Sequence, residues 1–458
     1  MCIDQRSLTD IIWSCFTTIF ACTWLSVHPN MPGPDEKCWK TVLRRLELML
    51  WSLICPEMII CWACRQWFAA RSLCDEYGGL GWTKTHGYFL QMGGFMLMDG
   101  DEMVGVLTPE MFRDLLQDGM IAFPSITEEE IEDRSKADGL AKGIAVLQTV
   151  WFIAQCISRK AQGLITTEVE LITLAFAALN GILYFLWWNK PLDVKCCVPV
   201  PYEDCEPVMI PSYTKPKRLT WRIFGMFFKS PGPEESTARE TAKVPHSNPK
   251  KSTQIFSSIF SWGHTWFLNS LGHLTGCAAM DTITLATTCA LFVKKALVEL
   301  LLLPFRAILV ILLRFQDFHR CDMVDEDAIR VPTFYAPAND DHGFFRVRIT
   351  TLIVATIFGG IHCAGWNFPF PSHAELIIWR VSSLIIVIVP WTFVPLLVTG
   401  FMGIDTIATK VYTMVSYSGA VIYVLARLTL FVEALTALRH LPPGAYAVVE
   451  WTALLLHM

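Results

Sequence analysis

Four of the charged residues inside long apolar segments, where ionisable side chains are rare, are our candidates for catalysis. They are Glu57, Glu299, Arg427 and Glu433. An ionisable group within a membrane costs several kcal/mol unless it is paired or hydrated, so each needs a physical reason to be there. We take Glu57, Glu299 and Glu433 as candidate general acids. Arg427 then needs an acidic partner, which any of the three could supply, and we include it in the candidate catalytic set.

Acids in apolar surroundings predict one kind of chemistry in particular. Burial keeps a carboxyl group neutral at working pH, and a neutral carboxyl can protonate an alkene or an epoxide. The resulting carbocation needs apolar walls with aromatic faces, which attract positive charge. Aromatic residues make up 12% of the chain, including 17 Trp and 29 Phe. These features favour a protonation-initiated cyclase, although Trp and Phe are also common at membrane interfaces for structural reasons.

A second group of residues lies near the predicted helix ends and could contact a substrate. It consists of Trp24, His28, His362, Trp366, Glu375 and Arg380. Each also has a structural interpretation, because a single histidine is more often a satisfied structural residue than a ligand. Glu375, likewise, could simply reach toward the headgroups. Lys295 and Glu299 are four residues apart and could form a pair within one helix.

The sequence predicts neither a metal site nor a cofactor. Cys61 and Cys64 have CxxC spacing, but they lie at the end of an apolar segment, where a thiol behaves as a small hydrophobic group. Cys196, Cys197 and Cys205 lie in a polar loop and leave pairing or metal binding open as a weaker alternative. The chain has no phosphate-binding loop, no dinucleotide-binding glycine motif and no zinc-protease motif.

The elements that must position these residues are membrane-spanning helices. Of 458 residues, 53% are apolar and 17% are charged, and the mean hydropathy is +0.41. The apolar residues come in blocks long enough to cross a bilayer core of about 30 Å. We expect an all-α polytopic bundle of about eight spans, within a range of seven to nine: 8–28, 44–64, 140–158, 165–188, 282–313, 349–368, 376–399 and 412–435. The first block is longer than a signal-peptide core and lacks a small-residue cleavage site, so we interpret it as a retained span.

The spans and the polar segments between them predict five regions. These are the first two spans (1–71), a small membrane-surface subdomain (72–138), spans three and four (139–190), a polar, largely disordered loop (191–254) and a C-terminal bundle (255–458). In the subdomain, Thr108-Pro109-Glu110 and Thr127 to Glu130 are typical of helix starts, and residues 86–98 suggest a short hairpin. The net charge of −5 and the lack of a basic stripe indicate no nucleic-acid partner.

Several motifs resemble a large fungal family of multi-pass membrane proteins. They are Cys22-Thr23-Trp24 through His28-Pro29-Asn30-Met31-Pro32, Trp187-Trp188-Asn189-Lys190-Pro191-Leu192-Asp193, and Gly360-Ile361-His362-Cys363-Ala364-Gly365-Trp366 with Phe370-Pro371-Ser372, Glu375 and Trp379-Arg380. The resemblance implies a fungal origin, a polytopic fold and a place in the endoplasmic reticulum or another endomembrane. Some such proteins are associated with secondary metabolism. The resemblance implies little about activity; the chemistry of a buried acid is what predicts an apolar isoprenoid-like or lipid substrate.

Two classes of function remain open. One is a membrane-embedded terpenoid or meroterpenoid cyclase that uses a buried acid and no cofactor. The other is a transporter, or a non-enzymatic scaffold whose partners are other membrane enzymes. Buried acids also serve as proton relays in transporters, and the absence of a visible internal repeat counts only weakly against one. Exchanging the candidate acids for Gln distinguishes the classes, because a scaffold would change in abundance without losing a product.

Overall fold

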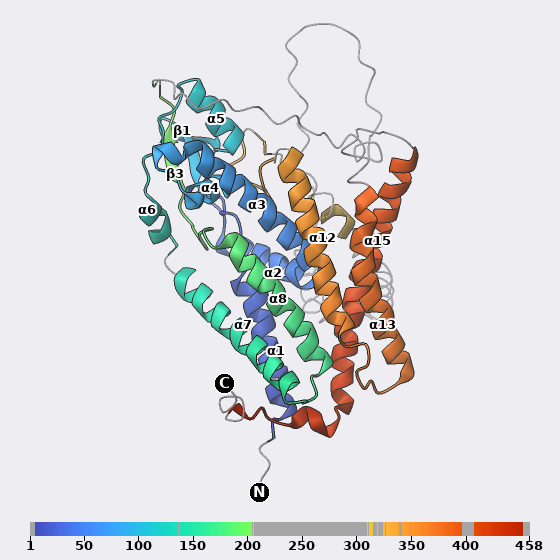
Figure 1. Ribbon diagram of the computed structural model, residues 1–458. Helices are drawn as coiled ribbons and strands as arrows, with labels where there is room; N and C mark the ends of the chain where they lie inside the picture. Colours follow the sequence, from blue (N-terminus) through green and yellow to red (C-terminus); the bar gives the residue numbers. More distant parts are fainter. Residues whose placement is uncertain are drawn as a thin grey trace, which may run out of the picture. The chain divides into compact units, whose positions relative to one another are not determined.

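The computed structural model describes residues 5–135, 138–203, 205, 309, 311–314, 318, 324–325, 327–338, 341–395 and 407–451. One compact unit is formed by Met1–Ile223 and Cys321–Met458 (Figure 1). A second unit, Phe224–Arg320, contains only six of the described residues, all of them helical. The candidate acid Glu299 and most of the predicted span 282–313 lie outside the described residues.

Six helices of the described chain are long and apolar enough to cross a membrane, and a bent pair could add a seventh. Eight spans are therefore not confirmed. The six are α1 (Leu8–Phe20) continued by the π-helix η1 (Ala21–Leu25), α7 (Asp138–Ala161), α8 (Glu168–Trp187), α12 (Asp341–Cys363), α13 (His373–Ile388) continued by the 3-10 helix η3 (Val389–Phe393), and α15 (Ile407–Ala437), which runs into η4 (Leu438–His440). Each agrees with a predicted apolar block to within a few residues at most ends.

The predicted span 44–64 is not one straight helix. It consists of the end of α2 (Cys38–Ile54) and the start of α3 (Pro56–Tyr77), which meet at Cys55 with a bend of 111°. Proline lacks an N–H and is suited to the first position of a new helix. Pro56 takes that position in α3, and it places Glu57 in the first turn. The break therefore places the Glu57 carboxylate at the point where α2 ends and α3 begins.

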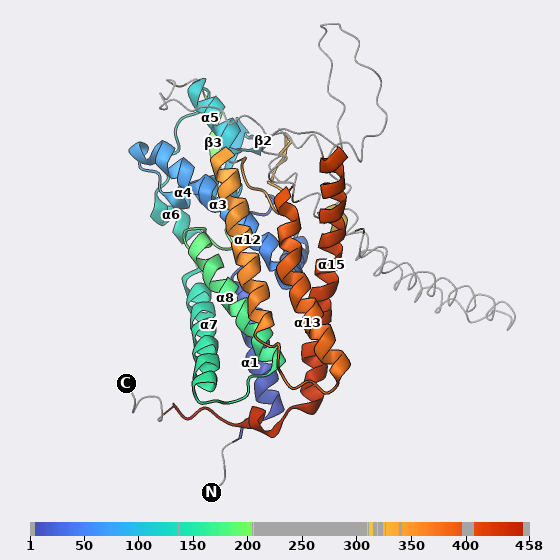
Figure 2. The same ribbon diagram turned by 45° about the vertical axis from the view of Figure 1, so that its right-hand side comes forward.

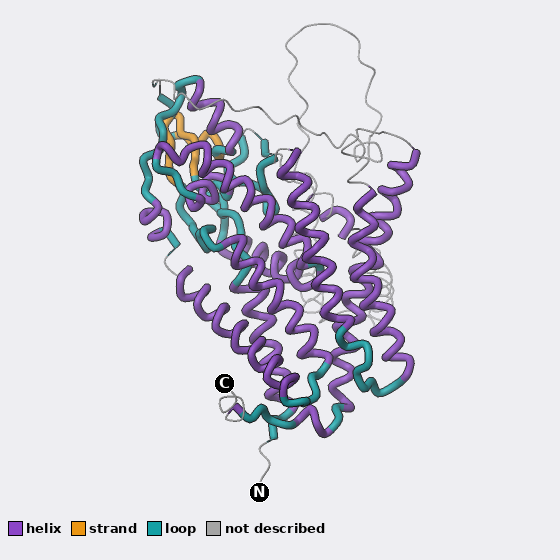
Figure 3. Tube along the Cα trace, viewed as in Figure 1, coloured by secondary structure: helices purple, strands orange, loops and turns teal. Residues whose placement is uncertain are grey.

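A small sheet corrects the all-α expectation (Figure 3). Strands β1 (Phe95–Asp99) and β2 (Glu102–Val106) form an antiparallel hairpin, and β3 (Val198–Pro201) pairs with β1 in parallel. The hairpin lies later than the predicted 86–98, because Thr83 and His86 form a capping box that starts helix α4 (Lys84–Gln91) instead. Strand β3 comes from the segment predicted to be a polar loop. Its two prolines are tolerated because it is an edge strand of the order β2-β1-β3.

Stacked aromatic rings form the core of the surface subdomain. The Trp82 ring stacks on Phe95 and Phe112 at centroid distances of 5.8 and 5.1 Å, and Tyr77 meets Trp82 edge-on at 5.2 Å. Helices α5 (Pro109–Gln117) and α6 (Glu128–Asp133) begin at Thr108 and Thr127, as the capping patterns predict. The short 3-10 helix η2 (Gly78–Leu80) and the sheet complete the subdomain around this core. The subdomain thus has a packed core of its own, at the end of the unit where α3 ends (Figure 1).

The two ends of the described chain are joined at the opposite end of the bundle (Figure 2). Two nitrogens of the Arg6 guanidinium donate to the two carboxylate oxygens of Glu170. Glu170 also forms the capping box at the start of α8. Arg159 donates to the carbonyl oxygens of Ile165 and Ala447 at 2.5 and 2.7 Å. The chain near Ala447, just after the 3-10 helix η5 (Pro443–Tyr446), is therefore held against α7 and α8. This arrangement explains Glu170 as a structural carboxylate.

Close packing of α12 against α13 predicts that alanine has different effects on stability at two adjacent glycines. A Cβ at Gly359 would lie 2.7 Å from Val387 Cγ2 and 3.0 Å from the Val387 backbone nitrogen, whereas a Cβ at Gly360 would meet nothing within 4 Å. We expect Gly359→Ala to lower stability by about 1–3 kcal/mol through overpacking. Gly360→Ala should be neutral or stabilising by up to about 1 kcal/mol, because alanine is the better helix former. Thermal unfolding of both variants in detergent checks this, and equal effects would contradict the helix contact.

An ion pair beside α2 predicts how stability depends on pH. Burial alone would raise the pKa of Glu36, but the hydrogen bond and charge of Arg44 lower it below its ordinary value. A carboxyl whose pKa falls on folding stabilises the folded state above its ordinary pKa, and this contribution is lost as pH falls through the folded pKa. We expect wild type to be more stable than Glu36→Gln at pH 6 and the difference to shrink below about pH 4. Unfolding midpoints in detergent from pH 6 to pH 3 measure this. A constant difference would contradict it.

Candidate functional site

The candidate site is centred on Glu57, at the break between α2 and α3. Glu57 is buried, and neither of its carboxylate oxygens makes a well-formed hydrogen bond to a described residue. The groups that act on it electrostatically are the guanidinium of Arg427 and the hydroxyl of Tyr423, both on α15. Helix α15 therefore brings a cation and a phenol to the carboxylate. Arg427 acts on the Glu57 carboxyl group through its charge and not through a direct ion pair, and it does so only because helices far apart in sequence pack together.

Arg427 is held in a buried aromatic cage. Its Cζ lies 4.2 Å from the ring centroid of Phe358, 5.3 Å from that of Phe176 and 5.7 Å from that of Phe431. Aromatic faces attract a cation, most strongly when water is excluded. Nη2 also donates to the carbonyl oxygen of Leu53, in the last turn of α2, at 3.3 Å. Arg427 thus stabilises the broken end of α2 and places a positive charge near Glu57.

His362 completes the cluster from α12. Its Nδ1 lies 2.9 Å from the carbonyl oxygen of Phe358, so this nitrogen carries the proton. The other nitrogen, Nε2, is then free to accept from Arg427 Nη1 at 3.3 Å. Trp379 Nε1 donates to the His362 carbonyl oxygen at 3.2 Å and fixes α13 against this turn. His362 is fully buried and orients Arg427.

The chemistry available to this cluster is proton transfer by Glu57 and Tyr423. Arginine keeps its proton in proteins, so Arg427 can stabilise charge but cannot act as an acid or a base. His362 already uses both ring nitrogens within the cluster. Glu57 can cycle between carboxyl and carboxylate, and Tyr423 lies beside it as a possible donor. The arrangement suits a general acid held in a dry site.

The remaining predicted acid on α15, Glu433, has a different environment. Its charged neighbours are Glu375 and Arg439, and Arg439 pairs with Glu375. Arg439 is 54% exposed, so this group lies near a surface of the protein and we do not pair Glu433 with Arg427. Of the two predicted acids that the structure describes, Glu57 is the one placed beside the cation.

Trp366 and Arg380 contact each other, but at a different place from Glu57. The Arg380 guanidinium lies 5.0 Å from the Trp366 ring centroid, and Nε donates to the Trp366 carbonyl oxygen at 2.9 Å. These contacts fix the connection between α12 and α13. The structure gives both residues a clear structural role, and substrate contact there stays a prediction.

His28 belongs to a second buried cluster, which sequence reasoning missed. Its centre is Lys190, a fully buried lysine just beyond α8. Lys190 Nζ donates to His28 O at 2.5 Å, Gln66 Oε1 at 2.9 Å and Asn30 Oδ1 at 3.2 Å. It also lies 4.5 and 4.6 Å from the ring centroids of two tryptophans, at positions 62 and 187. Two of the sequence motifs therefore converge on one ammonium group.

The ammonium at Lys190 has no carboxylate partner among these contacts. Burial lowers the pKa of Lys190 well below its ordinary value, while three oxygens and two indole faces favour the charged form. Gln66 extends the cluster by donating to the Tyr335 carbonyl oxygen at 2.9 Å. The cluster joins the segments before α2, within α3, after α8 and before α12. We interpret it as structural, because all three ammonium protons are used.

Trp24 lies at the end of the first span, in η1. The guanidinium of Arg45 sits 5.0 Å from its ring centroid, and the Trp24 ring stacks on Phe20 at 5.9 Å. An amphipathic ring with a cation on its face is typical of the membrane–water interface. Within the described chain, no group of three or more His, Cys, Asp or Glu side chains could hold a metal ion.

Comparison with known proteins gives one match. A model of a family of unknown function (DUF8562) matches residues 75–212, which run from the end of α3 past β3. The matched segment includes the surface subdomain, α7, α8 and Lys190, but neither Glu57 nor Arg427. No curated protein and no solved structure matches the chain. The fungal family suggested by the motifs is not confirmed by these comparisons.

Proposed function

We propose that this integral membrane protein is an enzyme that transfers a proton from Glu57 to an apolar substrate. The observation that carries the proposal is the Glu57 carboxyl group, buried at a helix break near Arg427 and Tyr423 with no well-formed hydrogen bond to any residue that the structure describes. Six apolar helices fit a membrane location, and a substrate reaching a site within them must itself be largely apolar. A carboxyl group in such a site is the acid that protonation of an alkene or epoxide requires.

An isoprenoid or meroterpenoid is the substrate class that we propose, with cyclisation as the reaction. We place the carbocation away from three of the aromatic rings of the bundle, because these rings already contact a cation. Phe176, Phe358 and Phe431 already face the Arg427 guanidinium, so their rings serve the enzyme's own cation. After proton transfer, the Glu57 carboxylate beside Arg427 would be the conjugate base. Arg427 thus favours proton release, which suits an acid that acts once per turnover.

The broken helix favours transport as a second candidate function. Discontinuous helices in transporters place helix ends near a coupling ion in the middle of the membrane. Here Arg427 binds the Leu53 carbonyl oxygen at the end of α2, and Glu57 begins α3. A carboxylate at such a break could carry a coupling proton. This candidate predicts proton-dependent uptake of a solute and no new covalent product.

Replacing Glu57 in the organism that carries the gene tests the proposal. We expect Glu57→Gln to remove at least one apolar compound from organic extracts, because glutamine cannot donate a catalytic proton. The matched control is Glu433→Gln, which changes another acid outside this cluster and should leave the compound in place. Protein abundance in membranes is measured in each strain. Unchanged extracts with normal abundance would contradict an enzymatic role for Glu57 and favour the scaffold alternative.

A further inference from the structure

Four buried polar atoms around Glu57 make no well-formed hydrogen bond to any residue that the structure describes. They are both carboxyl oxygens of Glu57, the hydroxyl of Tyr423 and Nε of Arg427. The three side chains are more than nine-tenths buried. Buried polar atoms in native proteins nearly always have a partner, so a group of four such atoms needs a functional explanation. Part of a bound substrate can supply the missing hydrogen bonds.

The Tyr423 hydroxyl and the Glu57 carboxyl group are neighbours. Each acts on the other through its side chain, but the geometry of the pair falls short of a well-formed hydrogen bond. Tyr423 belongs to α15 and Glu57 to the first turn of α3. Helix packing therefore brings a phenol and a carboxyl group to one place, where a third group can bond to both.

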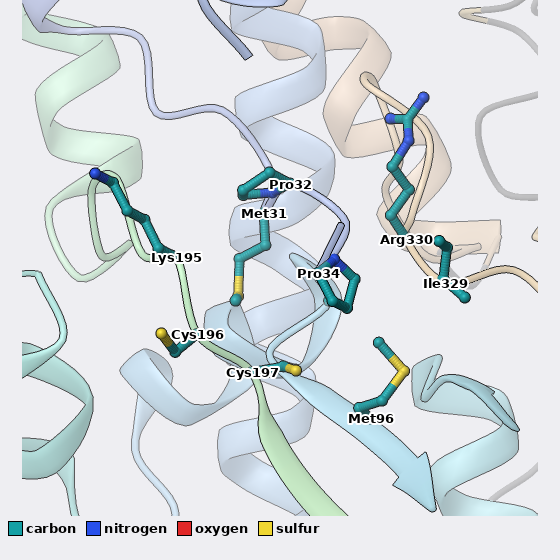
Figure 4. Close-up of a pocket in the computed structure, with 10 residues that line it drawn as sticks. Met31, Pro32, Pro34, Met96, Lys195, Cys196, Cys197, Ile329 and Arg330 are labelled. Carbon is teal, nitrogen blue, oxygen red and sulfur yellow. The ribbon is translucent and has the colours of Figure 1, made fainter. Parts of the chain in front are cut away.

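The cavity in Figure 4 is a different site. It has a volume of about 260 Å³ and is lined mainly by apolar and sulfur-containing side chains such as Met31, Met96 and Cys197. Its lining residues include neither Glu57 nor Tyr423, and none of them is a carboxylic acid. The missing hydrogen bonds around Glu57 are therefore not explained by a ligand in this cavity.

Hydrogen-bonding capacity indicates which substrate group fits between Glu57 and Tyr423. A neutral carboxyl group has one O–H donor and one acceptor oxygen, and a phenol both donates and accepts. An alkene alone satisfies none of these atoms, and a carbonyl or ether oxygen can only accept. A hydroxyl group can accept from the Tyr423 O–H and donate to the acceptor oxygen of Glu57. The Glu57 O–H then stays available for a double bond.

We propose that the substrate carries a hydroxyl group, held by Tyr423, which captures the carbocation and closes a cyclic ether. This inference rests on the proposed proton transfer by Glu57. The Glu57 proton adds to one carbon of the double bond, and the π electron pair forms the new C–H bond. A lone pair of the hydroxyl oxygen then forms a C–O bond to the other carbon. The substrate's O–H proton passes to the Glu57 carboxylate, so the reaction is an isomerisation that restores the acid.

The gene-dependent compound and the precursor that accumulates in Glu57→Gln cells test the inference. We expect both to have one molecular formula by high-resolution mass spectrometry. The compound should have one ring more and one hydroxyl group fewer, counted by silylation. Equal numbers of hydroxyl groups would overturn the inference and leave proton transfer by Glu57 intact. Extracts that do not change in Glu57→Gln cells would overturn both this inference and the proposed function.

Tyr423→Phe tests the residue that holds the hydroxyl group. We expect the cyclic ether to fall at least tenfold relative to new isomers that keep the hydroxyl group, because an uncaptured carbocation loses a neighbouring proton instead. The matched control is Tyr412→Phe, which removes a phenol 37% exposed on the same helix and should leave the products unchanged. A merely structural role for Tyr423 would lower the yield without changing the ratio of these products, and that result would overturn the proposal.

Discussion

Arg427→Met is expected to destabilise the protein by about 3–5 kcal/mol, because two buried acceptors lose their donor and three phenylalanine rings lose a desolvated cation. Arg427 is the cation that acts on the buried Glu57 carboxylate in the described chain, and it also binds the Leu53 carbonyl oxygen and three phenylalanine rings. Removing it leaves His362 Nε2 and the Leu53 carbonyl oxygen without their donor. The midpoint of thermal unfolding in detergent and the amount of protein in membranes both measure the loss.

A second substitution separates the charge effect from the lost packing. Arg427→Met combined with Glu57→Gln should be more stable than Arg427→Met alone, because no carboxyl group is then left without a nearby positive charge. The matched control is Arg439→Met, which removes a 54% exposed arginine paired with Glu375 and should cost no more than about 1 kcal/mol. If the double variant is as unstable as the sum of both single variants, Glu57 and Arg427 do not interact.

The second large effect is expected at Lys190. Lys190→Met keeps the length of the side chain but removes the donor from the oxygens of His28, Asn30 and Gln66. A buried acceptor without a donor costs about 1–3 kcal/mol, and desolvated cation–π contacts contribute about 2 kcal/mol each. Methionine also avoids the cost of burying an ammonium group, which offsets part of this loss. We therefore expect the free energy of unfolding to fall by about 3 kcal/mol.

Limited proteolysis together with unfolding in detergent measures the Lys190 effect. Because the cluster joins four segments, the loosened connections around His28 and Tyr335 should be cleaved first. Lys195→Met is the matched control, since residue 195 is an exposed lysine in the same connection and should change stability by no more than about 0.5 kcal/mol. A Lys190→Met protein as stable as wild type would show that the ammonium contributes nothing net to the fold.

The sequence predicted the helices far better than their contacts. Apolar blocks long enough for a bilayer located the six described spans, because length and hydropathy are local properties. The sequence left three acids as partners for Arg427, and only helix packing shows that Glu57 is the one on which its charge acts. The aromatic cage around Arg427 was not predictable for the same reason. Phe176, Phe358 and Phe431 lie on three different helices, and each reads as an ordinary apolar residue.

Sequence reasoning missed two features, the buried position of Lys190 and strand β3, and each has a physical reason. Lys190 looked like a loop charge near a helix end, because sequence does not reveal that three oxygens and two tryptophans surround it. Strand β3 is short and contains two prolines, which argue against a strand unless it lies at an edge. The division into five regions, the endomembrane location and the fungal origin stay predictions.

Heavy-water labelling tests the central proposal, proton donation by Glu57, most directly. Membranes from wild-type cells and from Glu57→Gln cells are incubated in deuterium oxide with the unlabelled apolar extract of Glu57→Gln cells, and the apolar compound that depends on the gene is analysed by mass spectrometry and NMR. Our account predicts one solvent-derived deuterium on a carbon of that compound, in a position that does not exchange, and no such compound in Glu57→Gln cells with normal amounts of the protein in membranes. A compound that forms without deuterium on carbon, or that forms equally well in Glu57→Gln cells, would contradict it.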